Sequence, residues 1–373
     1  MPLLSLAHAL KKSSPGCRVV YIGQKGETLS DSLKDRFTVF EQVFSIPAGK
    51  FRRYHGESLL AHLTDIRTVS LNIRDFFRVL SGTGYSLKYL KRLKPDVVFS
   101  KGGYVAVPVG IAARFLGIPI VTHDSDTVPG LANRIIGRFA TVHATGMPTG
   151  RYKYPAENTH YVGIPLDERI KLVTESMQTS FKKQLGLPAG SLVLLVGGAG
   201  LGARDVNNKV LAIAPALLQQ FNNLQIIHMS GHKHEKTVQT GYEAVVSSVI
   251  NRVRVIGFSG EFYKYTGAAD LVISRAGATT IAELAAQRKP VILIPAPHLT
   301  GGHQLKNAEE LAKNQAALVV ANDAPPDKLL QTVAKTLSDG SLRQKLADNL
   351  GRVAKIDAAD KLAELLLAVA NKK

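Results

Sequence analysis

Two strand–turn–helix patterns follow one another in the second half of the sequence. In the first, an apolar run at Leu271–Ser274 breaks at Arg275–Ala278 and apolar residues at helical spacing follow. In the second, the apolar run Pro290–Pro295 leads into Gly301–Gln304 and another helical pattern. A glycine turn of this kind points free backbone N–H groups and the positive end of a helix at the space above the strand tip. The patterns therefore predict a phosphate-binding fold, with a nucleotide diphosphate as the usual occupant.

The same alternation runs along most of the chain. Apolar runs predict strands at Arg18–Ile22, Val97–Ser100, Pro119–His123, Thr141–Ala144, His160–Val162, Leu192–Val196, Leu224–Met229, Val253–Ile256, Leu271–Ser274, Val291–Ile294 and Ala317–Val320. Helical spacing predicts helices at Val105–Leu116, Asp205–Gln220, Lys236–Val249, Thr280–Arg288, Gln304–Lys313 and Asp327–Ser338. Strands that alternate with helices form βαβ units, and strands that read as continuous apolar runs are buried on both faces of a parallel sheet. We therefore expect an α/β protein with parallel, doubly wound sheets.

A polar helical stretch at Pro165–Leu187 separates two such blocks. At 373 residues, two domains of ordinary size are expected. We place them at residues 1–165 and 166–353. Ligands of doubly wound units bind outside the carboxyl ends of the strands.

The charge balance favours an anionic partner. The chain has 47 Lys and Arg against 29 Asp and Glu, a formal net charge of +18. Nucleic acid, an acidic membrane face and phosphorylated substrates all suit this balance, but no basic motif with base-reading geometry is present, so a nucleic-acid partner is not expected. The single cysteine, Cys17, excludes an internal disulfide framework. The longest apolar stretch, Tyr104–Val121, is interrupted by Pro108 and Arg114, and it predicts a helix and a strand rather than a membrane span.

A second glycine-rich turn follows the strand at Leu192–Val196. Glycines 197, 198, 200 and 202 permit close backbone approach to a phosphate, although such turns also occur for packing reasons. No Gly-Lys-Ser/Thr sequence follows, so the segment is not a P-loop. The acidic residue that a dinucleotide fold carries about 20 positions further on is missing as well.

The first half carries two further polar segments at strand ends. Residues 100–104 read Ser-Lys-Gly-Gly-Tyr and form another candidate anion site with Lys101 beside it. Residues 122–126 read Thr-His-Asp-Ser-Asp. His123 is either a catalytic base or a residue that packs at a strand end. Asp124 and Asp126 resemble a metal-binding pair, but lone pairs of this type are mostly loop or cap residues.

The stretch Ile66–Lys94 holds seven Lys or Arg and one acid among Leu, Ile, Phe and Tyr. Apolar residues at helical spacing with basic residues between them suit an anionic membrane surface. The alternative is an ordinary pair of amphipathic helices packed on a sheet.

The motifs together resemble the MurG family of bacterial N-acetylglucosaminyltransferases. The resemblance rests on Gly-Gly-Tyr after a strand, H-x-x-x-x-x-x-G-L-x-N at His123–Asn133, V-G-x-P at Val162–Pro165, G-G-x-x-G-A-R, S-R-A-G-A-x-T-x-x-E and H-Q-x-x-N-A. It implies two Rossmann-like domains that face each other across a cleft (the GT-B type), with the last helix, at 354–373, returning to the first domain. It also implies the transfer of GlcNAc from UDP-GlcNAc, with inversion, to the C4 hydroxyl of undecaprenyl-diphosphoryl-MurNAc-pentapeptide in peptidoglycan synthesis.

The resemblance also assigns site residues. Glu283 would bind the uridine ribose, the backbone from Ala278 to Ile281 the diphosphate, Phe258 and Ser259 the uracil, and His303 and Gln304 the GlcNAc hydroxyls. The full donor set is Gly198, Ala199, Gly200, Gly202, Arg204, Phe258, Ser259, Arg275, Gly277, Ala278, Thr279, Thr280, Ile281, Glu283, His303, Gln304 and Asn307. The acceptor set is Gly102, Gly103, Tyr104, His123, Asp126, Asn133 and Asp167. No cofactor and no metal are expected. Ile66–Lys94 would dock on the cytoplasmic face of the cell membrane as a peripheral contact, near other cell-wall synthesis proteins.

Four departures from the family pattern concern the acceptor side and the donor loop. The family opens with a strand and a G-G-T-G-G-H loop, whereas Pro2 already suits a first helical position here. We therefore expect the chain as written to begin after that loop and its histidine, with the first domain loosened. Asp167 replaces an arginine, Asp126 an asparagine and Ala199 a serine of the family motifs.

These departures leave two other functions open beside the leading one. One is a glycolipid synthase with another lipid acceptor. The other is a protein that binds the donor but is impaired in transfer.

Overall fold

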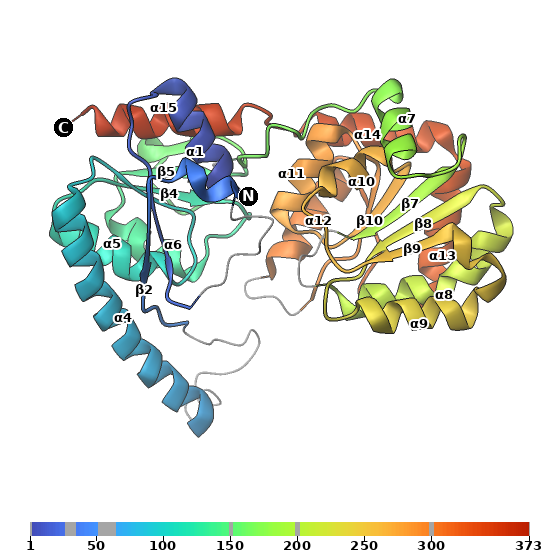
Figure 1. The fold of residues 1–373 in the computed structure, drawn as a ribbon, viewed down its shortest axis with the longest axis horizontal. Coiled ribbons are helices and arrows are strands. Elements are labelled where there is room, and N and C mark those ends of the chain that lie inside the picture. Colours follow the sequence, from blue (N-terminus) through green and yellow to red (C-terminus); the bar gives the residue numbers. More distant parts are fainter. Residues whose placement is uncertain are drawn as a thin grey trace. The chain divides into compact units, whose positions relative to one another are not determined.

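The computed structural model describes residues 2–26, 35–50, 65–148, 152–197, 202–297 and 302–372. The chain divides into two compact units (Figure 1). Unit 1 comprises Met1–Asp167 and Lys355–Lys373, and unit 2 comprises Glu168–Ala354. Every strand pairing described in either unit is parallel, as predicted from the continuous apolar runs.

The described residues of unit 1 form two parallel sheets. One pairs β1 (Val20–Gln24) with β2 (Gln42–Ile46), and the other has the order β3 (Val98–Ser100), β4 (Ile120–Asp124), β5 (Val142–Thr145) and β6 (Thr159–Tyr161). Strand β2 has no counterpart among the predicted strands. Its residues alternate between half-buried and exposed until Ile46, which is fully buried. A half-exposed strand lacks the continuous apolar run on which the predictions relied.

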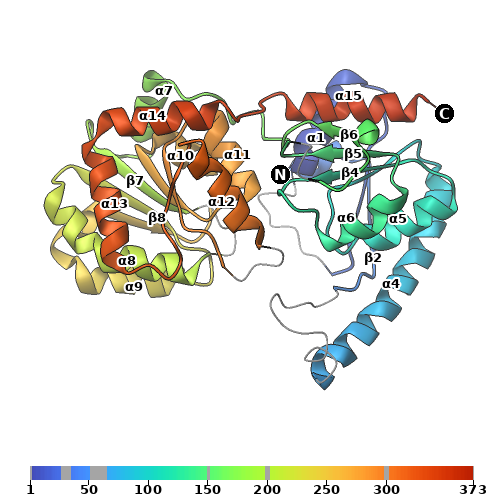
Figure 2. The same ribbon diagram turned by 180° about the vertical axis from the view of Figure 1, so that it is seen from behind.

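The helices of unit 1 cover the four-stranded sheet on both faces. Helix α1 (Pro2–Ser13), which begins at Pro2 as expected, packs with α15 (Ala358–Ala370) on one face (Figures 1 and 2). On the other face, α5 (Ala106–Phe115) lies beside α4 (Ile66–Leu93). The shorter elements are η1 (Asp35–Val39), α6 (Leu131–Ile136), η2 (Gly137–Phe139) and η4 (Ala156–Asn158). Helix α4 is one continuous helix of 28 residues, so the alternative of a helix pair does not hold.

The strands described in unit 2 form one six-stranded parallel sheet. Its spatial order is β12 (Leu318–Val319), β11 (Val291–Leu293), β10 (Leu271–Ser274), β7 (Leu192–Gly197), β8 (Leu224–Met229) and β9 (Val253–Ile256). From β7 the chain moves outward through β8 to β9, and it then returns to β10 on the opposite side of β7. The strand order therefore reverses between β7 and β10, and ligands of open α/β sheets bind at the carboxyl ends of the strands that flank such a reversal.

Alternate residues of these strands enter two separate cores. Leu194, Val196 and Ile273 pack against α8 (Arg204–Gln220), α9 (Glu235–Val245) and α13 (Pro326–Ser338). Val193, Leu195 and Val272 pack on the other face. The remaining helices are α7 (Glu175–Gln184), α10 (Phe262–Ala268), α11 (Ala278–Gln287), α12 (His303–Lys313) and α14 (Gly340–Gly351). The predicted helix at Lys236–Val249 is too long, because α9 ends at Val245 and the 3-10 helix η5 (Ser247–Arg252) follows with a non-helical Val249.

A buried lysine closes the end of α10. Lys289 is 4% exposed, and its Nζ donates to the carbonyl oxygens of Gly267 (2.8 Å) and Ala269 (3.2 Å). Burial lowers the pKa of Lys289 from 10.5 to about 8, although Asp270 opposes the shift. The charged form is therefore disfavoured in the folded state relative to the unfolded state.

We expect the free energy of unfolding to rise with pH between about 8 and 10.5 because of Lys289. In this window the unfolded lysine binds a proton that the folded one has lost, which contributes up to about 1.4 kcal/mol per pH unit. Denaturant unfolding of the wild type, of Lys289→Met and of the exposed control Lys345→Met at pH 7.5, 8.5 and 9.5 measures this. Only Lys289→Met should lose the rise; the same pH profile in all three proteins would contradict the assignment.

Candidate functional site

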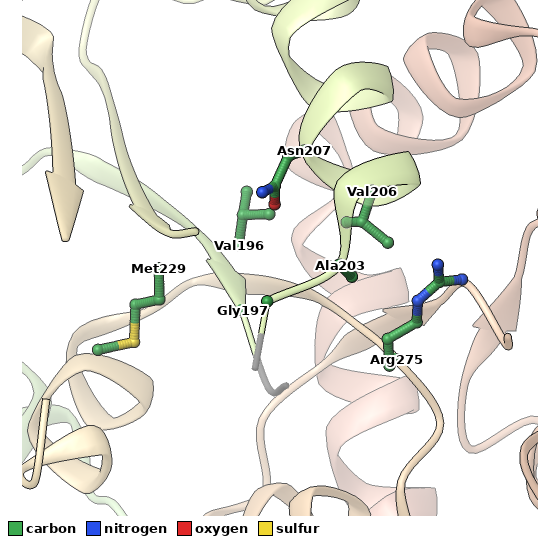
Figure 3. A pocket seen from close by; sticks show the side chains of 8 residues that line it. Val196, Gly197, Ala203, Val206, Asn207, Met229 and Arg275 are labelled. Atoms are coloured by element: carbon green, nitrogen blue, oxygen red, sulfur yellow. The ribbon is translucent and has the colours of Figure 1, made fainter. Parts of the chain in front are cut away.

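A small pocket lies at the strand reversal of unit 2. Its walls come from the ends of β7, β8 and β10 and from the start of α8: Val196, Gly197, Gly202, Ala203, Val206, Asn207, Met229 and Arg275. Figure 3 shows Val206 and Asn207 projecting from the first turn of α8, and Arg275 from the segment after β10. The carboxyl ends of several strands and one helix start thus meet at one place. This is the place where a doubly wound sheet binds its ligand.

The turn before α8 requires glycine at position 202. Gly202 has φ +78°, and a Cβ atom there would lie 2.2 Å from the carbonyl oxygen of Ser230. The N-cap residue Ala203 offers no side chain to the first N–H groups of α8. These groups and the helix dipole are therefore available to an anion. Of the predicted residues nearby, Arg204 is exposed at the first position of α8, and Gly198, Ala199 and Gly200 lie outside the described residues.

Arg275 ties three segments together beside this turn. Its guanidinium donates to the carbonyl oxygen of Ile294 (3.0 Å), to Asn322 Oδ1 (2.6 Å) and to Asp205 Oδ2 (3.4 Å). The side chain of Asp205 is 58% exposed, so solvent screens this ion pair. Arg275 itself is 8% exposed and places a positive charge at the wall of the pocket. Asn322 was not identified from the sequence, because it lies 47 residues from Arg275.

Helix α11 begins at a second uncapped turn. Its N-cap residue is Gly277, with extended backbone and no side-chain cap. Thr279, Thr280 and Glu283 are half-buried in the first turns of the helix, whereas the side chain of Ile281 is in the core. Ile281 can therefore offer only its backbone, which is the contact predicted for it.

The remaining predicted donor residues follow β9 and β11. Phe258 is 45% exposed, with its ring 5.4 Å from that of His232, and Ser259 Oγ accepts from the N–H of Glu261. Gln304 Oε1 accepts from the N–H of Ala296 at 2.9 Å. Buried Asn307 donates to the carbonyl oxygen of Ala276 at 3.0 Å and so supports the turn before α11. His303 is half-buried at the start of α12. His232 is an aromatic neighbour that the sequence patterns did not single out.

Unit 1 has a polar cluster at the carboxyl ends of β3 and β4. Gly102 (φ +86°) and Gly103 (φ +82°) form the turn after β3, as their left-handed backbone favours. The Nζ of Lys101 donates to Ser125 Oγ at 2.7 Å. Burial lowers the pKa of Lys101, and the nearby carboxylates of Asp126 and Asp124 oppose this shift. Tyr104 Oη donates to Gln24 Oε1, at the end of β1.

The imidazole of His123 is fully buried at the end of β4. Its Nε2 lies 2.8 Å from the carbonyl oxygen of Gly163, and its Nδ1 has no hydrogen-bond partner among the described residues. Burial, with a smaller effect of Lys101, lowers its pKa to about 4, so the ring is neutral near pH 7. Between the two interpretations from the sequence, these surroundings favour the residue that packs at a strand end.

Asp124 organises the start of α6. Its carboxylate accepts from Asn133 Nδ2 (2.9 Å) and from Tyr154 Oη (2.8 Å). Burial raises the pKa of Asp124, and these hydrogen bonds act in the opposite direction. Within the part of the chain that the structure describes, no group of three or more His, Cys, Asp or Glu side chains is placed to hold a metal ion. Asp167 is buried, at 5% exposure, where the chain leaves unit 1.

Known proteins match this chain over nearly its whole length. The glycosyltransferase family 28 N-terminal domain matches residues 1–145, and the family 28 C-terminal domain matches residues 192–362. The chain is 32% identical to the UDP-N-acetylglucosamine–N-acetylmuramyl-(pentapeptide) pyrophosphoryl-undecaprenol N-acetylglucosamine transferase of Listeria monocytogenes, over 99% of this chain and 95% of the relative. It is 30% identical to the enzyme of the same name from Leuconostoc citreum, over 100% and 96%.

Solved structures agree with this assignment. The crystal structure of Acinetobacter baumannii MurG has a TM-score of 0.70 and 26% identity, and covers 98% of this chain and 95% of that one. A Staphylococcus aureus MnaA–UDP structure, at 12% identity and a TM-score of 0.68, shares the fold. The two α/β units with parallel sheets, the two family 28 domain matches and the similarity to MurG together show a glycosyltransferase with the GT-B fold. The chain belongs to glycosyltransferase family 28.

Proposed function

We propose that this protein transfers GlcNAc from UDP-GlcNAc to undecaprenyl-diphosphoryl-MurNAc-pentapeptide, converting lipid I to lipid II in peptidoglycan synthesis. The observation that carries the proposal is the pocket at the strand reversal of unit 2, because its uncapped helix start suits a nucleotide diphosphate. Relatives that are 30–32% identical over nearly the whole chain are named for this donor and this lipid-linked acceptor.

The proposed chemistry is a displacement at the anomeric carbon with inversion. Negative charge develops on the departing UDP. The uncapped starts of α8 and α11 and the guanidinium of Arg275 supply positive charge in unit 2. Fixed dipoles and charges of this kind stabilise a leaving diphosphate in the transition state. We assign the ribose to Glu283, the uracil to Phe258 and Ser259, and the sugar hydroxyls to His303 and Gln304.

The transfer itself is tested with radiolabelled UDP-GlcNAc and three acceptors: the lipid-linked MurNAc-pentapeptide, its analogue without pentapeptide, and diacylglycerol. Label in the first acceptor alone is the expected result. Label only in diacylglycerol would replace the proposal by a glycolipid synthase. UDP-GlcNAc binding without label in any acceptor would leave a donor-binding protein.

We propose that α4 attaches the protein to the membrane that holds the acceptor, on its cytoplasmic face. Ile73, Phe76, Phe77 and Leu80 lie on one face of this helix and are each 51–63% exposed. Val79, Ser86 and Leu90 face the unit and are buried. The basic residues Lys88, Lys91 and Arg92 are exposed toward the end of α4. An exposed apolar stripe next to basic residues suits the surface of an anionic bilayer. None of the helices described here is both long enough and apolar enough to span a membrane.

Vesicle co-sedimentation tests this attachment. Binding should increase with anionic lipid and fall as salt screens the charges, with about a fivefold loss for each lysine that is replaced. The double variant Phe76→Ser/Phe77→Ser should lose binding even at low salt. Val245→Ser, which alters an apolar side chain that is 48% exposed in unit 2, serves as the control. Equal binding to neutral and anionic vesicles would refute the proposal.

We also propose that donor binding needs no metal ion. Asp124 and Asp126 lie in unit 1, while the proposed donor residues lie in unit 2, where helix starts and Arg275 supply the positive charge. Metal-stripped protein should bind UDP-GlcNAc with the same affinity in excess chelator as in excess magnesium. Loss of binding in chelator that magnesium restores would overturn this prediction.

A further inference from the structure

A chain of buried hydrogen bonds runs from α9 to the pocket of unit 2. Tyr242 Oη lies 2.9 Å from His228 Nδ1, and His228 Nε2 lies 3.0 Å from Asn207 Oδ1. Asn207 Nδ2 in turn donates to the carbonyl oxygen of Ser230 at 3.0 Å. Asn207 is 4% exposed, and the other three residues are fully buried. The chain therefore ties α9, β8 and α8 together without solvent.

The directions of these bonds follow from one another. The Asn207 amide nitrogen faces a carbonyl, so its Oδ1 must accept from His228. His228 Nε2 therefore carries the proton, and Nδ1 accepts from the hydroxyl of Tyr242. Burial lowers the pKa of His228 to about 3, which keeps the ring in the neutral form that this arrangement requires. Each of the three hydrogen bonds thus has a defined donor and a defined acceptor.

The carbonyl of Ser230, at the end of these hydrogen bonds, packs against the glycine turn that precedes α8. Ser230 O is the nearest atom to the missing Cβ of Gly202, at 2.2 Å, so the two backbones are in close contact. Gly202 and Asn207 both line the pocket (Figure 3 shows Asn207). Both polar atoms of the Asn207 side chain are already engaged within the protein. Asn207 is thus placed to shape the pocket rather than to bind its occupant.

We propose that Tyr242, His228 and Asn207 are positioning residues for the donor diphosphate. They fix the carbonyl of Ser230, and through it the Gly202 turn and the first turn of α8, whose N–H groups bind the diphosphate. This inference rests on the proposed donor site. When the chain is broken, the turn has to be ordered as UDP binds, and affinity falls for that reason. Acceptor binding is unaffected.

The test compares variants of these residues in UDP calorimetry and in steady-state transfer. His228→Leu and Asn207→Leu should raise the Kd for UDP and the KM for UDP-GlcNAc at least about tenfold, with the acceptor KM unchanged. His228→Gln retains a donor to Asn207 and should recover much of the affinity. Tyr242→Phe removes one hydroxyl and should give a smaller rise, of roughly threefold. Transfer by the wild type reports separately on the proposed function.

Thr336→Val is the matched control. It removes a buried hydroxyl that donates to the Thr332 carbonyl in α13 of the same unit. Neither threonine is among the residues that line the pocket. It should lower the melting temperature and leave UDP affinity unchanged. The inference is overturned if the His228 and Asn207 variants lose only thermal stability, or if Thr336→Val weakens UDP binding equally. If the leucine variants do not fold, an unchanged Kd for Tyr242→Phe overturns it.

Discussion

Replacing Glu283 by alanine is expected to weaken UDP binding about 30- to 1000-fold. Glu283 is half-buried in the second turn of α11, a helix that begins at the uncapped Gly277 next to the end of β10. A carboxylate that accepts hydrogen bonds from two ribose hydroxyls contributes roughly 2–4 kcal/mol, because hydrogen bonds to charged groups are stronger than neutral ones. Isothermal titration calorimetry with UDP measures the change directly.

Two further variants sharpen this test. Glu283→Gln keeps one carbonyl acceptor without the charge and should fall between the wild type and Glu283→Ala. Glu309→Ala removes an exposed carboxylate from α12 and should leave the affinity unchanged. Wild-type affinity in Glu283→Ala would exclude the ribose assignment. An equal loss of affinity for pyrophosphate, which has no ribose, would show that Glu283 acts on the diphosphate site instead.

Replacing Asn133 by alanine is expected to destabilise unit 1 by about 3–4 kcal/mol. Asn133 is 1% exposed and donates to the carbonyl oxygen of His123 and to Asp124 Oδ1, both at 2.9 Å. It also accepts from Ser100 Oγ at 3.3 Å. Its loss removes all three hydrogen bonds and leaves a buried carboxylate with one donor fewer, which is among the larger effects of a single substitution.

The deficit of Asn133→Ala should grow with pH. Burial raises the pKa of Asp124 above its ordinary value of 3.8, and the bond from Asn133 lowers it. Without Asn133 the folded pKa rises further. The stability that protonated Asp124 contributes is fully present below its pKa in the unfolded state. It is lost as the pH rises through the pKa of Asp124 in the folded state. The deficit should therefore be larger at pH 8 than at pH 5.

Hydrogen exchange measured by mass spectrometry locates this effect, since the chain has no tryptophan to report on each unit. Peptides from β3, β4 and α6 should exchange faster in Asn133→Ala, while those from β7 and β8 should be unchanged. The control Asn158→Ala alters an exposed asparagine of unit 1 and should match the wild type. Equal acceleration in both units, or none in either, would contradict the network described for Asp124.

Much of the α/β fold was predictable because its signals are local. Strands buried on both faces read as apolar runs, and the predicted bounds of β8, β9 and β10 match the structure residue for residue. The glycine turns at Gly202 and Gly277 precede helices α8 and α11. These helices begin directly after Ala203 and Gly277, one and two residues before the predicted starts at Asp205 and Thr280. Strand β2 was not predicted because exposed residues alternate with half-buried ones along it, which interrupts the apolar run.

Local patterns in the amino-acid sequence are enough to predict which segments become strands and helices and where glycine turns precede helix starts, since these depend on the spacing of neighbouring residues. The pairing of β10 with β7, which places the pocket, is visible only in the folded structure. Folding also brought together Arg275 with Asn322 and Tyr154 with Asp124, and it buried His123. Such contacts join residues tens of positions apart. They depend on which strands become neighbours and on which polar groups are buried away from water. The spacing of residues within a single segment gives no information on either.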